Sequence, residues 1–130
     1  MEESERAALN ELSGAIIGAA IEVHRTLGPG YLEQLYESAL CVELRARGIP
    51  FVRQPVIEVA YKGEVIGEGR LDLLVDGRIV VELKSVELVL GLHSAQLLSY
   101  LKAMKLHLGL LINFNVARLT DGGVQRVIRD

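Results

Sequence analysis

The stretch RLDLLVDGRIVVELK, residues 70–84, decides how this chain can be interpreted. Two runs of Leu, Val and Ile flank an Asp-Gly pair, a pattern that predicts a β-hairpin. Three charged residues, Asp72, Glu82 and Lys84, interrupt these hydrophobic runs. A carboxylate in a buried strand is costly unless something compensates it, and the usual compensation is a metal ion or a catalytic role. The hairpin is therefore the first candidate for a functional site.

The register of this hairpin determines whether the three charged residues can meet. Side chains alternate along a strand, so Glu82 and Lys84 share one face. A two-residue Asp-Gly loop would pair Asp72 with Val81 and turn Asp72 to the opposite face. A three-residue Val-Asp-Gly loop, with the glycine left-handed, would pair Asp72 with Val80. It would also put the two carboxylates on one face as diagonal neighbours, roughly 6–8 Å apart. We expect the longer loop.

Two convergent carboxylates and a lysine suit the hydrolysis of a phosphodiester. The carboxylates of Asp72 and Glu82 offer the hard oxygen ligands that Mg²⁺ prefers, and the metal neutralises phosphate and activates water. Lys84 can lower the pKa of that water or stabilise the charge that develops on phosphate. The alternative is an ordinary charged face of a surface hairpin, where a pair between Lys84 and Glu82 contributes less than about 1 kcal/mol. Spacing alone leaves both interpretations open.

The rest of the chain predicts one α/β domain that spans residues 1–130. Apolar residues recur at helical spacing in three segments, and a period of two follows residue 50. The order α-α-β-β-β-α-β-β indicates an α/β sandwich with a mixed sheet. The expected helices cover about residues 4–27, 31–47 and 94–104, the last capped by Ser94, and the expected strands cover 56–59, 64–75, 78–84, 106–113 and, at an edge, 124–128.

Composition excludes several classes of protein. The formal net charge is −3, which argues against a protein that grips nucleic acid by bulk electrostatics, although local binding of phosphate through a cation stays open. The apolar runs are too short to cross a bilayer, so no membrane association is expected. The acidic start of the chain does not resemble a secretory signal, and a single cysteine fits the reducing cytoplasm. Small size and high apolar content suggest a homo-oligomer, such as a homodimer.

Two sequence motifs bring a known family into view. Asp72, followed ten residues later by Glu82-Leu83-Lys84, resembles the PD-(D/E)XK nuclease superfamily, although Leu71 stands where the name of the superfamily has proline. The segment GYLEQLY, residues 30–36, matches the signature of the small bacterial GxxExxY proteins, which are placed in that superfamily by similarity. Its surroundings, AIEVHRTLGPGYLEQLYESAL, and the later HLGLLINFNV look like the same family, so the likeness covers about residues 9–128. The resemblance implies a restriction-endonuclease-like three-layer sandwich with a central mixed β-sheet.

The resemblance also implies roles for individual residues. Asp72 and Glu82 would bind the metal, Leu83 would offer its backbone carbonyl, and Lys84 would assist catalysis. Glu33 would point from its helix at the metal, although a glutamate in a first helical turn also simply favours the helix dipole.

The segment Gln96-Leu97-Leu98-Ser99-Tyr100 resembles the QxxxY element that follows the catalytic lysine in several exonuclease branches. Gln96 and Tyr100 lie four residues apart, so they share a helix face and would bind the scissile phosphate or order Lys84. A glutamine in a first helical turn is usually only solvated.

Two further residues of the family-like segment carry open alternatives. The hydroxyl of Tyr36 would contact phosphate or a ligating carboxylate, or Tyr36 is a core tyrosine with one hydrogen bond. His24 would support a ligand or activate water, or it is stabilised by the dipole at the end of its helix.

Taken together, these features predict a nuclease that uses Mg²⁺ or Mn²⁺ to hydrolyse DNA, or RNA, with metal-activated water. Two alternatives belong to other classes. One is a binding module that keeps the nuclease-like fold without catalysis, which the net acidity favours. The other is a subunit of a larger repair or processing assembly, in which partner chains grip the DNA.

Overall fold

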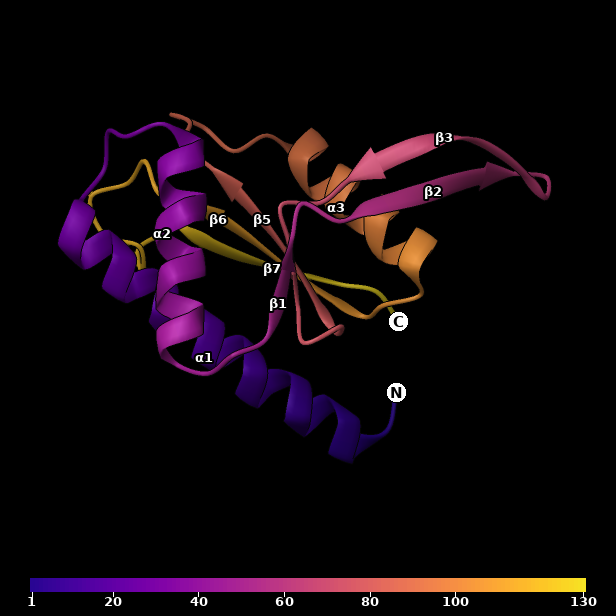
Figure 1. Cartoon of the computed structure of the whole chain (residues 1–130), viewed down its shortest axis with the longest axis horizontal. Helices are drawn as coiled ribbons and strands as arrows, with labels where there is room; N and C mark the ends of the chain where they lie inside the picture. The colour runs from indigo at the N-terminus through magenta and orange to yellow at the C-terminus, as the bar shows by residue number, and fades with distance from the viewer.

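A five-stranded mixed sheet forms the centre of the molecule, and the computed structural model describes all of residues 1–130 (Figure 1). The strand order is β1-β4-β5-β6-β7. Strands β5 and β6 run parallel, and every other neighbouring pair is antiparallel, which confirms the mixed sheet. The edge position expected for the last strand is also confirmed. The strands are β1 (Phe51–Arg53), β4 (Leu73–Val75), β5 (Ile79–Lys84), β6 (Leu108–Asn113) and β7 (Val124–Ile128).

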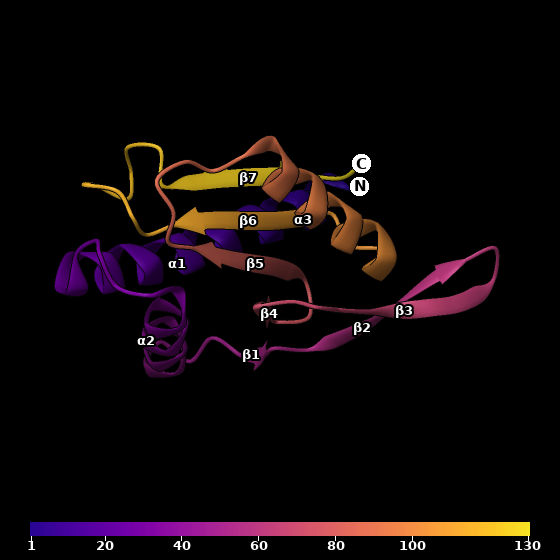
Figure 2. The same ribbon diagram turned by 90° about the horizontal axis from the view of Figure 1, so that it is seen from above.

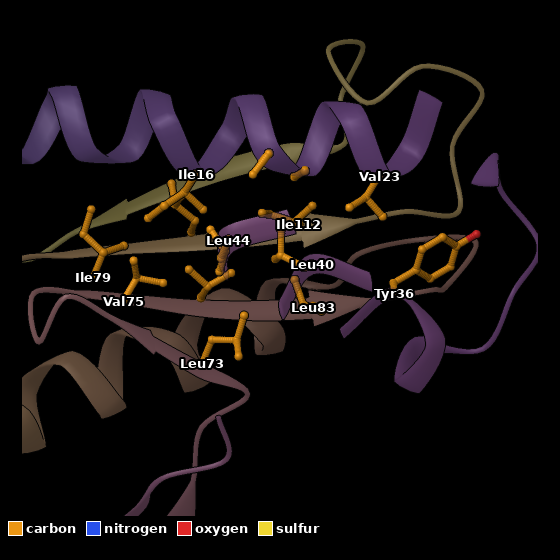
Figure 3. Close-up of a cluster of buried hydrophobic side chains, with 14 of the residues drawn as sticks. Ile16, Val23, Tyr36, Leu40, Leu44, Leu73, Val75, Ile79, Leu83 and Ile112 are labelled. Atoms are coloured by element: carbon orange, nitrogen blue, oxygen red, sulfur yellow. The ribbon is translucent and has the colours of Figure 1, made fainter. Parts of the chain in front are cut away.

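Helices cover both faces of this sheet, so the three-layer α/β architecture is confirmed. Helices α1 (Glu3–Leu27) and α2 (Glu33–Ala46) pack on one face, and α3 (Gly91–Met104) packs on the other (Figure 2). No helix combines the length and the apolar character that a membrane crossing would need. The larger core lies between the sheet and the first two helices, and Figure 3 shows many of its members: Ile16, Val23, Tyr36, Leu40, Leu44, Leu73, Val75, Ile79, Leu83 and Ile112.

Successive side chains of β5 point to opposite faces of the sheet, so this strand contributes to the cores on both faces. Ile79, Val81 and Leu83 enter the core beneath α1 and α2, whereas Val80 enters a smaller core beneath α3. Glu82 and Lys84 follow the parity of Val80, so they face the layer that holds α3. The smaller core consists of Ile57, Leu71, Val80, Leu97, Leu101 and Leu111.

A separate two-stranded sheet, β2 (Val56–Tyr61) with β3 (Glu64–Arg70), projects from the body of the molecule (Figures 1 and 2). The single strand expected over residues 64–75 is therefore wrong, because the chain changes sheets at Leu71 and Asp72. The N–H of Leu71 still donates to the carbonyl of Pro55, but the carbonyl of Asp72 accepts from Gln54. Strand β1 was not expected, since three residues are too few to show an alternating pattern.

The turn between β4 and β5 has the expected length of three residues but lies one residue later in the sequence. Val75 pairs with Ile79, so the loop spans residues 76–78, and both Asp76 and Gly77 have a positive φ. The predicted pair of Asp72 with Val80 is therefore wrong, because Val80 pairs with Leu74. The parity is unchanged, so Asp72 still shares a face with Glu82, and continuing the register would place them directly opposite each other.

Helix boundaries differ from the expected ones mainly at the start of α3. The helix begins at Gly91 rather than at Ser94, so the cap assigned to Ser94 is wrong. The Nδ1 atom of His93 accepts the N–H of Leu90 and fills the capping role. Ser94 instead accepts a hydrogen bond from Gln125 on β7. The complete order is α-α-β-β-β-β-β-α-β-β, with two more strands than the sequence predicted.

Candidate active site

Asp72, which is half-buried, and Glu82, which is buried, meet at the point where β4 begins beside β5. The N–H of Asp72 donates to Oε1 of Glu82 at 3.4 Å, and the N–H of Leu83 donates to Oδ2 of Asp72 at 2.7 Å. Only 8% of Glu82 is exposed. The two carboxylates therefore converge, as the hairpin parity requires.

The two carboxylates lie close enough for their negative charges to repel each other. The pKa of the Glu82 carboxyl is raised, first by burial and then by the negative charge of Asp72. The positive charge of Lys84 opposes this effect only weakly. A site of this kind gains stability when a cation enters, because the cation neutralises both acids at once.

The backbone of Leu83 offers a third oxygen to the same place. The N–H and C=O of a strand residue point to the same side, and the N–H of Leu83 points at Asp72. The carbonyl of Leu83 therefore faces the same edge of β5 as that N–H. The ladder between β4 and β5 ends at the pair Leu73 and Val81, so this carbonyl lies beyond the last paired residues of β4.

Lys84 ends β5 and is anchored by the strand next to it. Its carbonyl accepts the N–H of Phe114, and it pairs in register with Asn113. The buried amide of Asn113 bonds both the N–H and the carbonyl of Val86. The chain on either side of Lys84 is therefore fixed, although the lysine side chain itself remains partly exposed.

Helix α2 brings Glu33 to this site. The pKa of Glu33 is raised by burial, and among its charged neighbours Lys84 lowers that pKa while Asp72 raises it. Glu33 and Asp72 also line one cavity of about 280 Å³, together with Gln34, Glu37 and Gln54, and no hydrophobic residue contributes to its wall. The first turn of α2 and the carboxylate pair thus share one polar space.

Helix α3 closes the other side of the site. The pKa of Tyr100 is raised by burial and then by the negative charges of Glu82 and Asp72. Gln96 donates to the Tyr100 hydroxyl at 3.2 Å, so these two residues act as a pair, as their spacing predicts. The ring of Tyr100 packs closely on the backbone of β3, since a Cβ added at Gly69 would lie 3.0 Å from it.

The donor set fits a small hard cation. Asp72 and Glu82 supply carboxylate oxygens and Leu83 supplies a carbonyl, and Mg²⁺ typically binds one or two carboxylates and keeps several waters. No group of three or more His, Cys, Asp or Glu side chains has the arrangement of a metal centre. Glu33 therefore lies near the pair without completing a cluster with it, and the remaining ligands would be waters.

Two predicted site residues lie elsewhere. Tyr36 is fully buried, stacks on Phe114, and donates its hydroxyl proton to the carbonyl of Gly28, which matches the alternative of a core tyrosine. His24 is buried and bonds the carbonyl of Val116 through Nε2, beside a cleft that contains neither Asp72 nor Glu82. The structure therefore gives both residues a role in holding the loops together.

Comparison with known proteins agrees with this geometry. A protein-family model described as the PD-(D/E)XK nuclease superfamily matches residues 10–127, which is most of the chain. The chain belongs to the PD-(D/E)XK nuclease superfamily. No match was found among curated proteins. The narrower resemblance to GxxExxY proteins stays a prediction.

Membership of the PD-(D/E)XK superfamily agrees with the charged residues of the hairpin β4–β5. Asp72 and the run Glu82-Leu83-Lys84 resemble the acids and the lysine of the superfamily motif, with Leu71 in place of the proline. Leu71 is fully buried beneath α3, so the smaller core accounts for an apolar residue at that position.

Sequence reasoning missed the network that holds Asp72 in place within this PD-(D/E)XK fold. The buried carboxylate of Glu37 accepts hydrogen bonds from Arg53 at 2.7 Å and from the side chain of Gln54 at 2.8 Å. The N–H of Gln54 donates to the carbonyl of Asp72 at 2.8 Å. The only sequence signal was that Glu37 lies one helical turn after Glu33, on the same face of α2.

Proposed function

We propose that this protein is a nuclease that hydrolyses phosphodiester bonds of nucleic acid with the help of a bound divalent cation, Mg²⁺ or Mn²⁺. The observation that carries the proposal is the convergence of Asp72, Glu82 and the carbonyl of Leu83, with Lys84 next along the same strand. Membership of the nuclease superfamily supports the reaction class. DNA is the substrate we expect first.

Each side chain of the site has a role in this proposal. Asp72, Glu82 and the Leu83 carbonyl would hold the cation, which when bound neutralises phosphate and lowers the pKa of a coordinated water. Lys84 stabilises the negative charge that develops on the phosphate oxygens as water attacks. Glu33 lies where it can accept a proton from the attacking water or orient that water. Its raised pKa makes it a better proton acceptor than an ordinary carboxylate.

Helix α3 contributes groups that position the substrate. Gln96 and the hydroxyl of Tyr100 form a hydrogen-bonded pair close to the acids, and both can donate to a phosphate oxygen. Because the ring of Tyr100 is wedged against β3, its hydroxyl has little freedom to move. We therefore assign Gln96 and Tyr100 to the binding of the scissile phosphate or the ordering of Lys84.

The direct test is cleavage of labelled DNA and RNA by the purified protein in Mg²⁺ or Mn²⁺, with EDTA as the blank. The double variant Asp72→Ala, Lys84→Ala should lose all cleavage. Asp76→Asn is a matched control, since it removes a carboxylate from the same hairpin, outside the site, and asparagine tolerates the positive φ of that position. Cleavage that persists in the double variant would refute the proposal.

One observation favours a second candidate function. The cavity beside Asp72 is lined by acids and amides and has no cationic residue in its wall, so a single chain offers few contacts to phosphates. This suits a catalytically silent binding module, or a subunit whose partners grip the nucleic acid. Isothermal titration with Mn²⁺ separates the candidates, because a silent module has no need of a metal, and the absence of heat at millimolar Mn²⁺ would favour it.

A further inference from the structure

Tyr31 presents an aromatic ring that is exposed and yet firmly held. Tyr31 is 47% exposed. Its ring packs edge-on against the ring of Tyr36, with the ring centroids 6.1 Å apart. The N–H of Tyr31 donates to the hydroxyl of Tyr36 at 3.2 Å, and its carbonyl accepts from Ser85 at 2.7 Å. An exposed ring whose backbone is fixed at both ends loses little conformational freedom when something binds to it.

This ring belongs to the segments that build the candidate active site. Ser85, its hydrogen-bond partner, directly follows Lys84 on the chain, and Glu33 lies two residues after Tyr31. Leu32 and Leu35, which flank Glu33, are exposed too, so the apolar surface continues along the first turn of α2. A contiguous group of exposed apolar side chains is unusual on a protein surface and often marks a site of interaction. Such a group beside a polar site indicates a contact surface.

The charge pattern suggests what this surface contacts. The cavity next to it is lined by Glu33, Glu37 and Asp72, so a polyanionic strand gains little from the protein's own charges here. Stacking of a base on an aromatic ring does not depend on phosphate contacts and tolerates any sequence. We propose that Tyr31 stacks against a nucleobase next to the scissile phosphate, and that the site therefore acts on single-stranded nucleic acid. This inference rests on the proposed nuclease function.

The preference for a single strand follows from geometry. In a duplex, both faces of each internal base are covered by its neighbours in the stack, so a fixed ring has no face to contact. In a single strand or a frayed end, a base can leave its neighbours and lie on the ring. Leu32 and Leu35 then provide an apolar surface for the adjoining sugar or base.

The test compares binding and cleavage of matched oligonucleotides by wild type, Tyr31→Ala, Tyr31→Phe and Tyr61→Ala. Tyr61 lies at the end of β2 and is also exposed, so Tyr61→Ala removes an exposed tyrosine that lies in a different sheet. Fluorescence anisotropy in Ca²⁺ gives dissociation constants, and single-turnover cleavage in Mn²⁺ gives rates. The substrates are a single-stranded oligonucleotide, the same strand with abasic sites, and the corresponding duplex.

Tyr31→Ala should weaken binding of the single strand by about 5- to 150-fold, the range that loss of one stacked base contact produces. Tyr31→Phe should bind within about twofold of wild type, because phenylalanine keeps the stacking face, and Tyr61→Ala should not differ from wild type. The abasic strand should bind wild type as weakly as the intact strand binds Tyr31→Ala.

Two results would overturn the inference and leave the proposed function standing. One is a wild-type enzyme that cleaves duplex faster than single strand. The other is a Tyr31→Ala variant that binds and cleaves the single strand as wild type does. A wild-type protein that neither binds nor cleaves any of the substrates would instead overturn the proposed nuclease function, and this inference with it.

Discussion

Glu37 and Glu82 are both buried glutamates, only 6% and 8% exposed, yet their surroundings are opposite in kind. Glu37 on α2 faces Arg53 and Gln54, which donate to both of its oxygens. Glu82 on β5 faces another acid, Asp72, and receives one long hydrogen bond from a backbone N–H. The first carboxylate is compensated by the protein itself, and the second is not.

This difference separates a structural carboxylate from a functional one. A buried ion pair with satisfied hydrogen bonds ties two elements together and needs nothing further. Two acids that are packed against each other cost stability, and proteins retain such strain mainly where a ligand relieves it. The central claim is therefore that the Asp72–Glu82 pair is completed by a divalent cation.

The largest effect expected is on the chemical step. Lys84→Met should reduce cleavage at least about 100-fold, the loss typical of removing one group that stabilises transition-state charge. Its affinity for Mn²⁺ should stay within a few-fold of wild type, since the ligands are untouched. The control is Lys102→Met, an exposed lysine of α3. A Lys84→Met enzyme with full activity would remove the lysine from the mechanism.

The structural glutamate should matter most for folding. Glu37→Ala should lower the free energy of unfolding by about 2–3 kcal/mol, less than for a fully buried pair because Arg53 is partly exposed. Denaturation by urea measures it. In the same helix, Glu43→Ala breaks a pair with Arg47 nearer the surface and should cost less than about 1 kcal/mol. Equal effects of the two variants would mean that the Glu37 network has no special importance.

The network should also affect the metal site indirectly. Gln54→Gly removes the amide that bonds Glu37, and glycine accepts the positive φ of this position. The backbone N–H of residue 54, which bonds the carbonyl of Asp72, is kept in this variant but is no longer anchored through the side chain to Glu37. Mn²⁺ affinity should therefore fall about tenfold, as for other groups that orient metal ligands. Gln34→Ala removes another amide from the same cavity and should leave the affinity unchanged in calorimetric titration.

The smallest expected effect concerns pH. The pKa of Glu82 is raised from 4.5 to about 9 by burial and by Asp72, so between these values the folded protein holds a proton that the unfolded chain has lost. Without metal, stability should therefore fall as pH rises through this window. Glu82→Gln should be more stable than wild type by at least about 1 kcal/mol at pH 8 in EDTA, and nearly equal to it at pH 4. Thermal unfolding in EDTA, repeated across this pH range, measures the difference. Identical pH profiles would show that the pair is not strained.

The sequence predicted much of this arrangement because strand parity is a local property. A period of two put Glu82 and Lys84 on one face, and a three-residue loop put Asp72 with them. The exact register was beyond reach, since it depends on positive φ at both Asp76 and Gly77. The break at Leu71 and the short strand β1 were not predicted, because they depend on partners far away in the sequence: the N–H of Leu71 donates to the carbonyl of Pro55, and the N–H of Gln54 donates to the carbonyl of Asp72.

For the predicted site residues on α2 and α3, the sequence likewise predicted some contacts and left others open. Gln96 and Tyr100 form a hydrogen bond, as their spacing of four predicts, and Glu33 shares a cavity with Asp72, while its role stays a prediction. For Tyr36 the family signature left two roles open, and only the contacts with Gly28 and Phe114 show that it serves the core. A motif identifies which residues matter and leaves open which of them face the substrate.

A crystal soaked in Mn²⁺ at pH 8 tests the central claim most directly, through the anomalous signal of the ion. The account predicts one peak between residues 72 and 82, in contact with an oxygen from each carboxylate and with the carbonyl of Leu83. A crystal in which the two acids remain in mutual contact, with manganese absent or bound elsewhere, would contradict it.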